Sequence, residues 1–368
     1  MKTIKIHCTN DNKCHEIAPG TTLAELAEAI GCTTVKSSTG EDIPVLTALV
    51  DHKMEQMDFE LFLPHSITFV GYDNSNARRA YSRSLTFVLQ KVVRDMFPDK
   101  VLVIDYALPS GLYCELQDKN THEPFYMTED NIALITGKMQ EIIEQDIPFS
   151  KEKMTLEEAV GHFKSNGQDE KARLAEYVVD FVVSIYTLGD CIDTFYGPLL
   201  ASTGMLKLFS LLPFSNGFCL QTPLDSSFTK LMPMKRQSKI DSVLKEYSQW
   251  GRILGVHDIG SLNQAIENGR AEELIRLGEA RHERNYAKIA EMIYDRRDHS
   301  KVVFIAGPSS SGKTSSSLRI ALQCRVRGLN PKVIELDNYF VDRARTPLDE
   351  NGEYDFESLQ AMDLELLN

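Results

Sequence analysis

Apolar and polar residues alternate at the start of the chain, and helical spacing follows. Asn10, Asp11 and Asn12, which are typical turn residues, separate two alternating stretches. Thr22 then precedes apolar positions at helical spacing, where a threonine can cap a helix. The pattern predicts a small domain over residues 1–64 that contains a hairpin, a helix and further strands. Its strands are expected at residues 3–7, 14–17, 45–50 and 59–62.

Longer helical stretches alternate with strands in residues 65–228, which predict a second, α+β domain. Its expected elements are a helix from Arg79 toward Phe97, a strand over residues 110–116 and a helix that begins after Met154 behind a threonine cap. Residues 229–299 carry no catalytic motif. They hold two amphipathic stretches, residues 240–254 and 271–297, and predict a helical connector.

Residues 300–368 show a different pattern. A short apolar run, residues 302–306, leads into a G-x-x-x-x-G-K-T loop from Gly307 to Thr314. A helical stretch follows until Gly328 stops it, and residues 332–336 form a second apolar run. Strand, helix and strand of these lengths predict a βαβ unit with parallel strands, the start of a P-loop α/β domain. The fold class expected for the whole chain is therefore α/β and α+β, in several domains.

The glycine-lysine loop has the chemistry of a phosphate site. Glycine lets the backbone curl so that successive N–H groups point at a phosphate, and the following helix adds its positive end. Lys313 would place a full charge on the β- and γ-phosphates, and the Thr314 hydroxyl would ligate Mg²⁺. ATP with Mg²⁺ is the expected cofactor. The residues expected to hold it are Gly307, Ser309, Ser310, Ser311, Gly312, Lys313, Thr314 and Ser315.

Asp337 comes directly after the second apolar run. Parallel strands end at one edge of a sheet, so its carboxylate is expected to face the loop. An aspartate is ionised at neutral pH, and it would orient an acceptor hydroxyl and take its proton late in phosphoryl transfer. Asp337 and Lys313 are thus the expected catalytic residues.

The segment Asp337-Asn-Tyr-Phe340 resembles the motif after the second strand of uridine/cytidine kinases, which are P-loop nucleoside kinases. The resemblance implies transfer of the ATP γ-phosphate to a ribonucleoside 5′-hydroxyl. It also implies that Asp355 binds the ribose hydroxyls and that Tyr339 lies beside the nucleoside. The match departs from the family where Phe356-Glu357 stands in place of His-Pro. Because the chain ends at Asn368, the kinase domain is expected to be truncated and inactive alone.

The first two domains resemble parts of threonyl-tRNA synthetases. Pro19-Gly-Thr-Thr-Leu23 before the first helix resembles the TGS domain, a β-grasp fold. Residues 65–228 resemble the editing domain of these synthetases, through Ser110–Leu116, Gly189–Pro198 and Ser202–Phe209. That family edits with two histidines on the first helix and a cysteine and a histidine in the later motif. The matching positions here are Ala80, Ser84, Phe195 and Leu199, so the resemblance implies a scaffold without hydrolysis.

Composition and net charge limit the classes of partner that the sequence predicts. The net charge of −13 disfavours nucleic acid as a general partner and leaves a local patch in the first two domains open. Seven dispersed cysteines and the absence of a long apolar run predict a cytoplasmic protein with no membrane contact. A zinc site at His7, Cys8, Cys14 and His15 is disfavoured, because neighbouring strand residues point to opposite faces. A nucleoside substrate is expected, and homo-oligomers stay open.

The leading hypothesis is a nucleoside kinase. The alternative is a regulatory protein that binds RNA or tRNA and uses the P-loop as a nucleotide switch. A GTPase is disfavoured because no N-K-x-D motif occurs.

Overall fold

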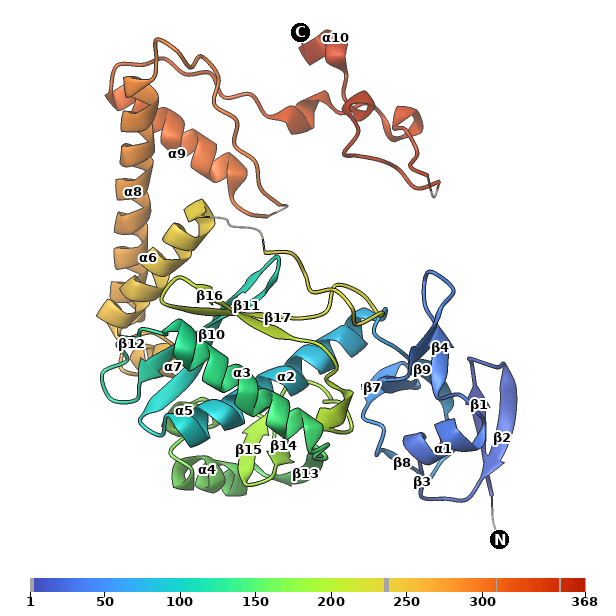
Figure 1. The fold of residues 1–368 in the computed structure, drawn as a ribbon. Helices are drawn as coiled ribbons and strands as arrows, with labels where there is room; N and C mark the ends of the chain where they lie inside the picture. The colour runs from blue at the N-terminus through green and yellow to red at the C-terminus, as the bar shows by residue number, and fades with distance from the viewer. Residues whose placement is uncertain (1–2, 235–237, 309, 351, 368) are drawn as a thin grey trace. The chain divides into compact units, whose positions relative to one another are not determined.

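The computed structural model describes residues 3–234, 238–308, 310–350 and 352–367 (Figure 1). The chain divides into two compact units, Met1–Gln264 and Ala265–Asn368. The first unit holds separate sheets covered by helices, and the second is built from helices and irregular turns. The coarse prediction of a mixed α and β architecture in several parts is confirmed. None of the helices that the structure describes is long and apolar enough to cross a membrane.

The first unit opens with a five-stranded sheet in the order β2-β1-β9-β6-β7. Its strands are β1 (Ile4–Cys8), β2 (Lys13–Ile17), β6 (Thr47–Val50), β7 (Lys53–Glu55) and β9 (Ser66–Val70). β1 pairs with β9 in parallel, and the other neighbours are antiparallel. The central strand β9 lies beyond residue 64, where the first domain was expected to end. Two short pairs, β3 (Thr21–Thr22) with β8 (Glu60–Leu61) and β4 (Thr34–Lys36) with β5 (Asp42–Pro44), complete this part.

A helix covers this sheet, as the sequence predicts. Helix α1 (Leu23–Ala29) begins at a capping box in which the Thr22 hydroxyl accepts from the Glu25 N–H and the Glu25 carboxylate accepts from the Thr22 N–H. Its buried residues, Leu23, Leu26 and Ala27, lie on one face and join the core of the sheet.

A larger α+β region follows. Its main sheet has the order β10-β11-β17-β16, from β10 (Lys100–Leu108), β11 (Gly111–Asp118), β16 (Ser210–Phe214) and β17 (Gly217–Gln221), and β12 (Pro124–Phe125) pairs with β11. A second sheet joins β13 (Ser150–Thr155), β14 (Val182–Leu188) and β15 (Cys191–Thr194). Helices α2 (Ser75–Met96) and α3 (Glu129–Glu144) pack against the main sheet. Helices α4 (Leu156–Ser165) and α5 (Asp169–Ala175) pack beside the small one, and a short turn η1 (Thr203–Met205) lies near α3.

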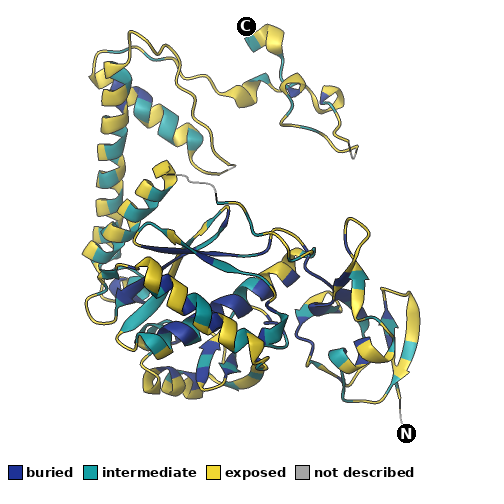
Figure 2. Cartoon of the chain, viewed as in Figure 1, coloured by how far each residue is buried: buried dark blue, intermediate teal, exposed yellow. Residues whose placement is uncertain are grey.

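Helix α2 is the centre of the largest hydrophobic core. Eleven of its 22 residues are buried, from Ala77 to Val93, because both sheets and α3 contribute apolar side chains around it. Figure 2 shows the buried residues gathered along α2 and the facing strands. The first sheet is joined to this region by buried contacts, such as the Gln56 side-chain amide donating to the Phe149 carbonyl at 2.7 Å.

Helices dominate the rest of the chain. α6 (Ser238–Leu254) ends the first unit together with the start of α7 (Ile259–Glu267). In the second unit α8 (Ala271–Asp295) packs on α9 (Lys313–Val326), where Glu283 pairs with Arg319 and Glu291 with Arg327. Short turns η2 (Leu336–Tyr339), η3 (Arg343–Arg345), η4 (Leu359–Ala361) and a last helix α10 (Leu364–Leu367) follow.

The predicted βαβ unit does not form in the described residues. Residues 302–306 and 332–336 lie outside any strand and are exposed, with Phe304 85% exposed and Ile334 62% exposed. A parallel strand is stable when neighbouring strands pair with it and helices cover both faces. Helix α9 lies between the two runs and packs on α8, and among the described residues no strand pairs with either run. The helix of the predicted unit is present, and its two strands are wrong.

Close approach of strands gives a test of the main sheet. A Cβ added at Gly217 in β17 would lie 2.1 Å from the Cys114 carbonyl oxygen of β11. We expect Gly217→Ala to lower the urea midpoint of the first unit by the equivalent of about 2 kcal/mol or more, because the backbones must separate. Gly137→Ala in α3, where nothing lies within 4 Å, is the matched control and should stabilise by up to about 1 kcal/mol. Equal effects of the two changes would contradict the strand pairing.

Candidate functional site

The loop before α9 has the geometry of a phosphate-binding turn. Gly312 caps α9 with φ 79° and Ser310 has φ 59°, so the backbone passes through the left-handed region twice. The Lys313 ammonium donates to the carbonyls of Gly307 and Pro308, each at 3.0 Å. The loop therefore curls around the end of this side chain. A Cβ at Gly307 would lie 2.7 Å from the Ser311 hydroxyl oxygen, so a larger residue there would require the Ser311 side chain to move.

The other predicted loop residues surround this turn. Ser311 follows the left-handed Ser310, and both are exposed. Thr314 and Ser315 are exposed in the first turn of α9, where the helix N–H groups are unpaired by the helix itself. Ser309 lies outside the described residues. The structure thus brings together the glycines, Lys313 and Thr314 of the predicted nucleotide site.

In the described residues, the pair of parallel strands that was expected to place Asp337 at this loop does not form. Asp337 lies exposed in η2, and in the described residues it forms no ion pair with Lys313. Asp355 is occupied locally, because its carboxylate accepts from the N–H groups of Glu357 and Ser358. Tyr339 is half-buried where its carbonyl accepts from the Asp363 N–H at 2.7 Å. The predicted convergence of Asp337 with the loop depended on a pair of parallel strands, and those strands are absent here.

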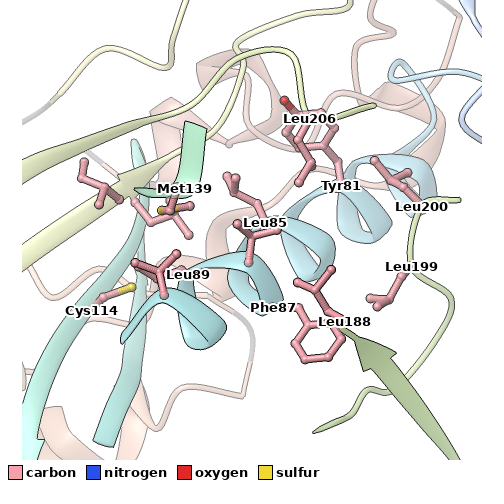
Figure 3. Close-up of a cluster of buried hydrophobic side chains, with 14 of the residues drawn as sticks. Tyr81, Leu85, Phe87, Leu89, Cys114, Met139, Leu188, Leu199, Leu200 and Leu206 are labelled. Carbon is pink, nitrogen blue, oxygen red and sulfur yellow. The ribbon is translucent and has the colours of Figure 1, made fainter. Parts of the chain in front are cut away.

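A second candidate region lies in the first unit, where α2 meets residues 195–200. The Ser84 hydroxyl donates to the Ala80 carbonyl at 2.9 Å and accepts from the Leu200 N–H at 2.8 Å, all fully buried. The Phe195 ring lies 5.3 Å from that of Phe87. Figure 3 shows Leu199 and Leu200 beside α2, close to Phe87 and Leu188. The four positions that matched editing residues therefore lie within one packed apolar interior.

This interior has no group poised for hydrolysis. Leu199 is fully buried and Phe195 packs on the core. The nearby Cys191 is buried, and burial raises the pKa of its thiol to about 11, so it stays protonated at neutral pH. A neutral thiol within apolar side chains is a weak nucleophile. In the described residues, these side chains contribute to the packing of the core.

The surface above this interior is cationic. The Arg83 guanidinium donates twice to the Pro198 carbonyl, at 3.1 and 2.7 Å, and lies against Gly197. Arg79 is one turn earlier on α2, is exposed, and donates to the Asn76 side-chain oxygen at 3.3 Å. Among the described residues no carboxylate lies within ion-pair distance of either arginine. The Tyr196 side chain, next to Gly197, is 92% exposed. We call Arg79, Arg83 and Tyr196 the arginine–tyrosine surface.

A cleft of about 670 Å³ opens between the main sheet and α6. Its floor holds Asp105 and Glu115, and burial raises the pKa of the Asp105 carboxyl. The Tyr106 hydroxyl donates to Asp241 at 2.8 Å, and Arg252 lies 3.5 Å from Glu115, so α6 is fixed to the sheet at two points. His122 and His257 line one end. No motif in the sequence marks this cleft, because its residues come from distant segments.

The hairpin histidines and cysteines do not gather. His7 pairs across the strands with Cys14, while Cys8 pairs with Lys13 and is buried. In the part of the chain that the structure describes, the one cluster with metal-ligand spacing is formed instead by His122, Glu170 and His257.

Curated proteins similar to this chain include threonine–tRNA ligases. Over 209 residues it is 30% identical to the threonine–tRNA ligase of Desulforamulus reducens, which covers 56% of this chain and 31% of that protein. Over 244 residues it is 26% identical to the enzyme of Symbiobacterium thermophilum, covering 66% and 35%. The chain therefore spans about a third of the length of these curated relatives. No protein-family profile matches it.

These relatives correct two predictions. Each is named for a ligase that acts on tRNA, and none of these relatives is a nucleoside kinase, so the prediction of a uridine-kinase-like phosphotransferase is wrong. The prediction that nucleic acid is a disfavoured partner is also wrong, since tRNA is named as the partner of every one. The resemblance of the chain to threonyl-tRNA synthetases is confirmed in this coarse form.

The buried serine on α2 gives a test of the packed interior. We expect Ser84→Ala to lower the stability of the first unit by about 1–3 kcal/mol, because the Leu200 N–H loses its acceptor inside the core. Urea unfolding followed by circular dichroism measures this change. Ser82→Ala, on the same helix and only half-buried, should change stability by less than about 0.5 kcal/mol. A Ser84 variant as stable as the Ser82 variant would show that the segment 195–200 does not pack on α2.

Proposed function

We propose that this chain binds tRNA without hydrolysing an aminoacyl group, and that the arginine–tyrosine surface is its contact. The observation that carries the proposal is the similarity to threonine–tRNA ligases over more than half of the chain. Those enzymes are named for a reaction on tRNA. A chain with a similar sequence is therefore a candidate to bind tRNA as well. The packed interior at Ala80, Ser84, Phe195 and Leu199 supports a proposal of binding without hydrolysis.

Charge is concentrated where RNA contact is proposed. Although the whole chain carries −13, helix α2 holds Arg78, Arg79, Arg83, Lys91 and Arg94 against the single acid Asp95. Toward the C-terminal end of α2, Lys91 and Arg94 are paired with Asp95 and Asp190. At the N-terminal end the charge of Arg79 and Arg83 is not compensated by a carboxylate in the described residues. Phosphate contacts need such local cationic charge and do not need a positive protein overall.

The exposed tyrosine adds a stacking platform. Single-stranded RNA is held by cationic side chains on its backbone and by aromatic rings that stack on unpaired bases. Tyr196 is 92% exposed, and its neighbours Gly197 and Pro198 are fixed by Arg83 and by the Tyr186 hydroxyl, which donates to the Gly197 carbonyl at 3.1 Å. The ring is therefore presented from a fixed backbone. We place an unpaired segment of the tRNA, such as an end or a loop, on this surface.

Arg79 and Tyr196 test the RNA surface. We expect Arg79→Gln to weaken tRNA binding and to reduce the slope of log affinity against log salt by about 0.7–0.9, the loss of one phosphate contact. Tyr196→Ala should cost about 1–3 kcal/mol of binding free energy from lost stacking. Fluorescence anisotropy with labelled tRNA, titrated at several salt concentrations, measures both.

Matched surface variants distinguish this site from general charge. Lys138→Gln on α3 and Tyr126→Ala, a tyrosine 67% exposed elsewhere in the first unit, should leave the affinity unchanged. If all four variants bind alike, the surface is wrong. A wild-type chain that fails to bind tRNA at physiological salt would overturn the proposed function itself.

A second ligand, a nucleotide, is supported by the turn before α9. We propose that this loop holds the phosphates of ATP, with Gly307, Gly312, Lys313 and Ser315 around them and Thr314 at Mg²⁺. The left-handed Gly312 and the curled loop around Lys313 fit such a group, because the same backbone turn can direct its N–H groups at a phosphate. Bound Mg²⁺ would neutralise phosphate charge. Nucleotide binding here would let the chain respond to ATP, and no phosphoryl transfer is proposed.

Lys313 tests this ligand separately from RNA. We expect Lys313→Ala to weaken binding of a fluorescent ATP analogue on the order of tenfold or more, since it removes the only full positive charge proposed at the phosphates. Thr314→Val should abolish the gain in affinity that Mg²⁺ gives and spare the rest. Lys332→Ala, an exposed lysine of the same unit, is the control. If the Lys313 variant kept full affinity for the ATP analogue, the nucleotide site would be wrong. The proposal of tRNA binding would still stand, because it rests on other residues.

A further inference from the structure

Three potential metal ligands from separate segments meet at one end of the cleft in the first unit. His122 lies in the turn between β11 and β12, Glu170 in the first turn of α5, and His257 between α6 and α7. One ligand atom from each lies within 4.8 Å of the others. His122 Nδ1 is 3.5 Å and His257 Nε2 is 3.9 Å from the same Glu170 oxygen. Figure 1 shows α5, α7 and β12 in the same region of the unit.

Local structure fixes each of these side chains. The Asp118 carboxylate accepts from the N–H groups of Asn120 and Thr121, and these bonds hold its pKa well below the usual range. They close the turn that carries His122, whose backbone has φ 55° and donates to the Asp118 carbonyl at 3.0 Å. A non-glycine residue in the left-handed backbone region costs of order 1–3 kcal/mol of conformational free energy. The rest of the turn therefore has to stabilise His122 in this conformation.

The other histidine follows a helix end. Gly255, with φ 70°, ends α6, and the Val256 N–H returns to the Gly251 carbonyl at 2.9 Å. His257 comes next, and Asp258 then caps α7, with one carboxylate oxygen accepting from the Ser261 N–H at 2.6 Å. That bond orients the second Asp258 oxygen, which lies 3.2 Å from His257 Nε2.

Three polar atoms near the cluster are buried and make no hydrogen bond in the described structure. They are His122 Nδ1, His257 Nε2 and the second Asp258 oxygen. Buried polar atoms are rarely left in this state, because each one has lost its contact with water. The two rings lie 4.1 Å apart, centre to centre, which disfavours a positive charge on both.

We propose that His122, Glu170 and His257 bind one divalent transition-metal ion of the Zn²⁺ class. Two ligands at about 2.0–2.1 Å from a tetrahedral ion are separated by about 3.3 Å. The nitrogen–oxygen separations of 3.5 and 3.9 Å are close to that spacing and longer than good hydrogen bonds. Small rotations of the side chains would therefore bring all three donors onto one ion, which would satisfy both buried nitrogens.

The donor set selects the class of ion. Two imidazoles and one carboxylate favour zinc and its transition-metal neighbours, whereas Mg²⁺ and Ca²⁺ prefer oxygen ligands alone. Three protein ligands leave a fourth position open. Asp258 lies beside His257, and the cleft opens beside both histidines, so this position would be filled by the Asp258 oxygen or would face the cleft.

Zinc binding by the full chain tests the proposal. We expect chelator-treated protein in reducing buffer to take up one equivalent of Zn²⁺, measured by competition with a chromophoric chelator. Co²⁺ should give the visible absorption bands of a tetrahedral nitrogen and oxygen site. His257→Gln, Glu170→Gln and His122→Asn should each lower Zn²⁺ affinity on the order of 100-fold or more, since even partners outside the ligand shell cost about 10–100-fold. Asparagine is chosen at residue 122 because it tolerates a positive φ.

Controls separate this site from incidental zinc binding and from misfolding. His282→Gln, an exposed histidine in the second unit, and Cys14→Ser, the exposed thiol opposite His7, should retain full affinity. Zinc should raise the melting temperature of the wild-type chain and of these controls, and should not raise that of the three ligand variants. Ligand variants that bind zinc like wild type, loss of binding in Cys14→Ser, or uptake of less than one equivalent would each overturn the proposal.

Discussion

The packing of α2 against residues 195–200 is the contact on which the candidate RNA surface depends. The Ser84 hydroxyl satisfies the Leu200 N–H inside the core, and the Arg83 guanidinium satisfies the Pro198 carbonyl at its edge. One helix therefore fixes both the interior and the surface of this segment. Because Gly197 and Pro198 are held in place, the backbone at Tyr196 is fixed while its side chain is exposed. Arg79 lies one turn from Arg83 on the same face of α2.

This arrangement fits the proposal that the chain binds tRNA without hydrolysing an aminoacyl group. A hydrolytic site needs a nucleophile or metal and room for water, and Leu199 and Phe195 fill that room with carbon. The same apolar side chains add to the core around α2, so the exchange favours stability. The exposed side chains Arg79 and Tyr196 are cationic and aromatic, and these are the properties that the proposed RNA contact requires. The net charge of −13 does not reveal this local cationic surface, because a net charge counts paired and unpaired charges equally.

Local signals made much of the fold predictable, and long-range contacts did not. Thr22 with Glu25 and Thr155 with Glu158 form capping boxes whose partners are three residues apart, so the sequence shows where α1 and α4 begin. The loop at Gly312 and Lys313 was predictable for the same reason. The strands at 302–306 and 332–336 were not, because an apolar run becomes a strand only where other strands pair with it. His122, Glu170 and His257 carry no common motif, and only the packing of distant turns brings them together.

Glu115 on the floor of the cleft and Glu170 beside the two histidines differ in the groups that surround their carboxylates, and that difference supports the proposed metal at Glu170. At Glu115, the Tyr113 hydroxyl, the Gln117 amide and Arg252 all approach the carboxylate, so the group is compensated by the protein itself. At Glu170 the neighbours are two imidazoles whose facing nitrogens make no hydrogen bond. The Glu170 side chain is 34% exposed, and among the described residues no comparable set of three donors surrounds its carboxylate. We propose a cation at this cluster because a single divalent ion would pair with the two imidazoles and the carboxylate at once.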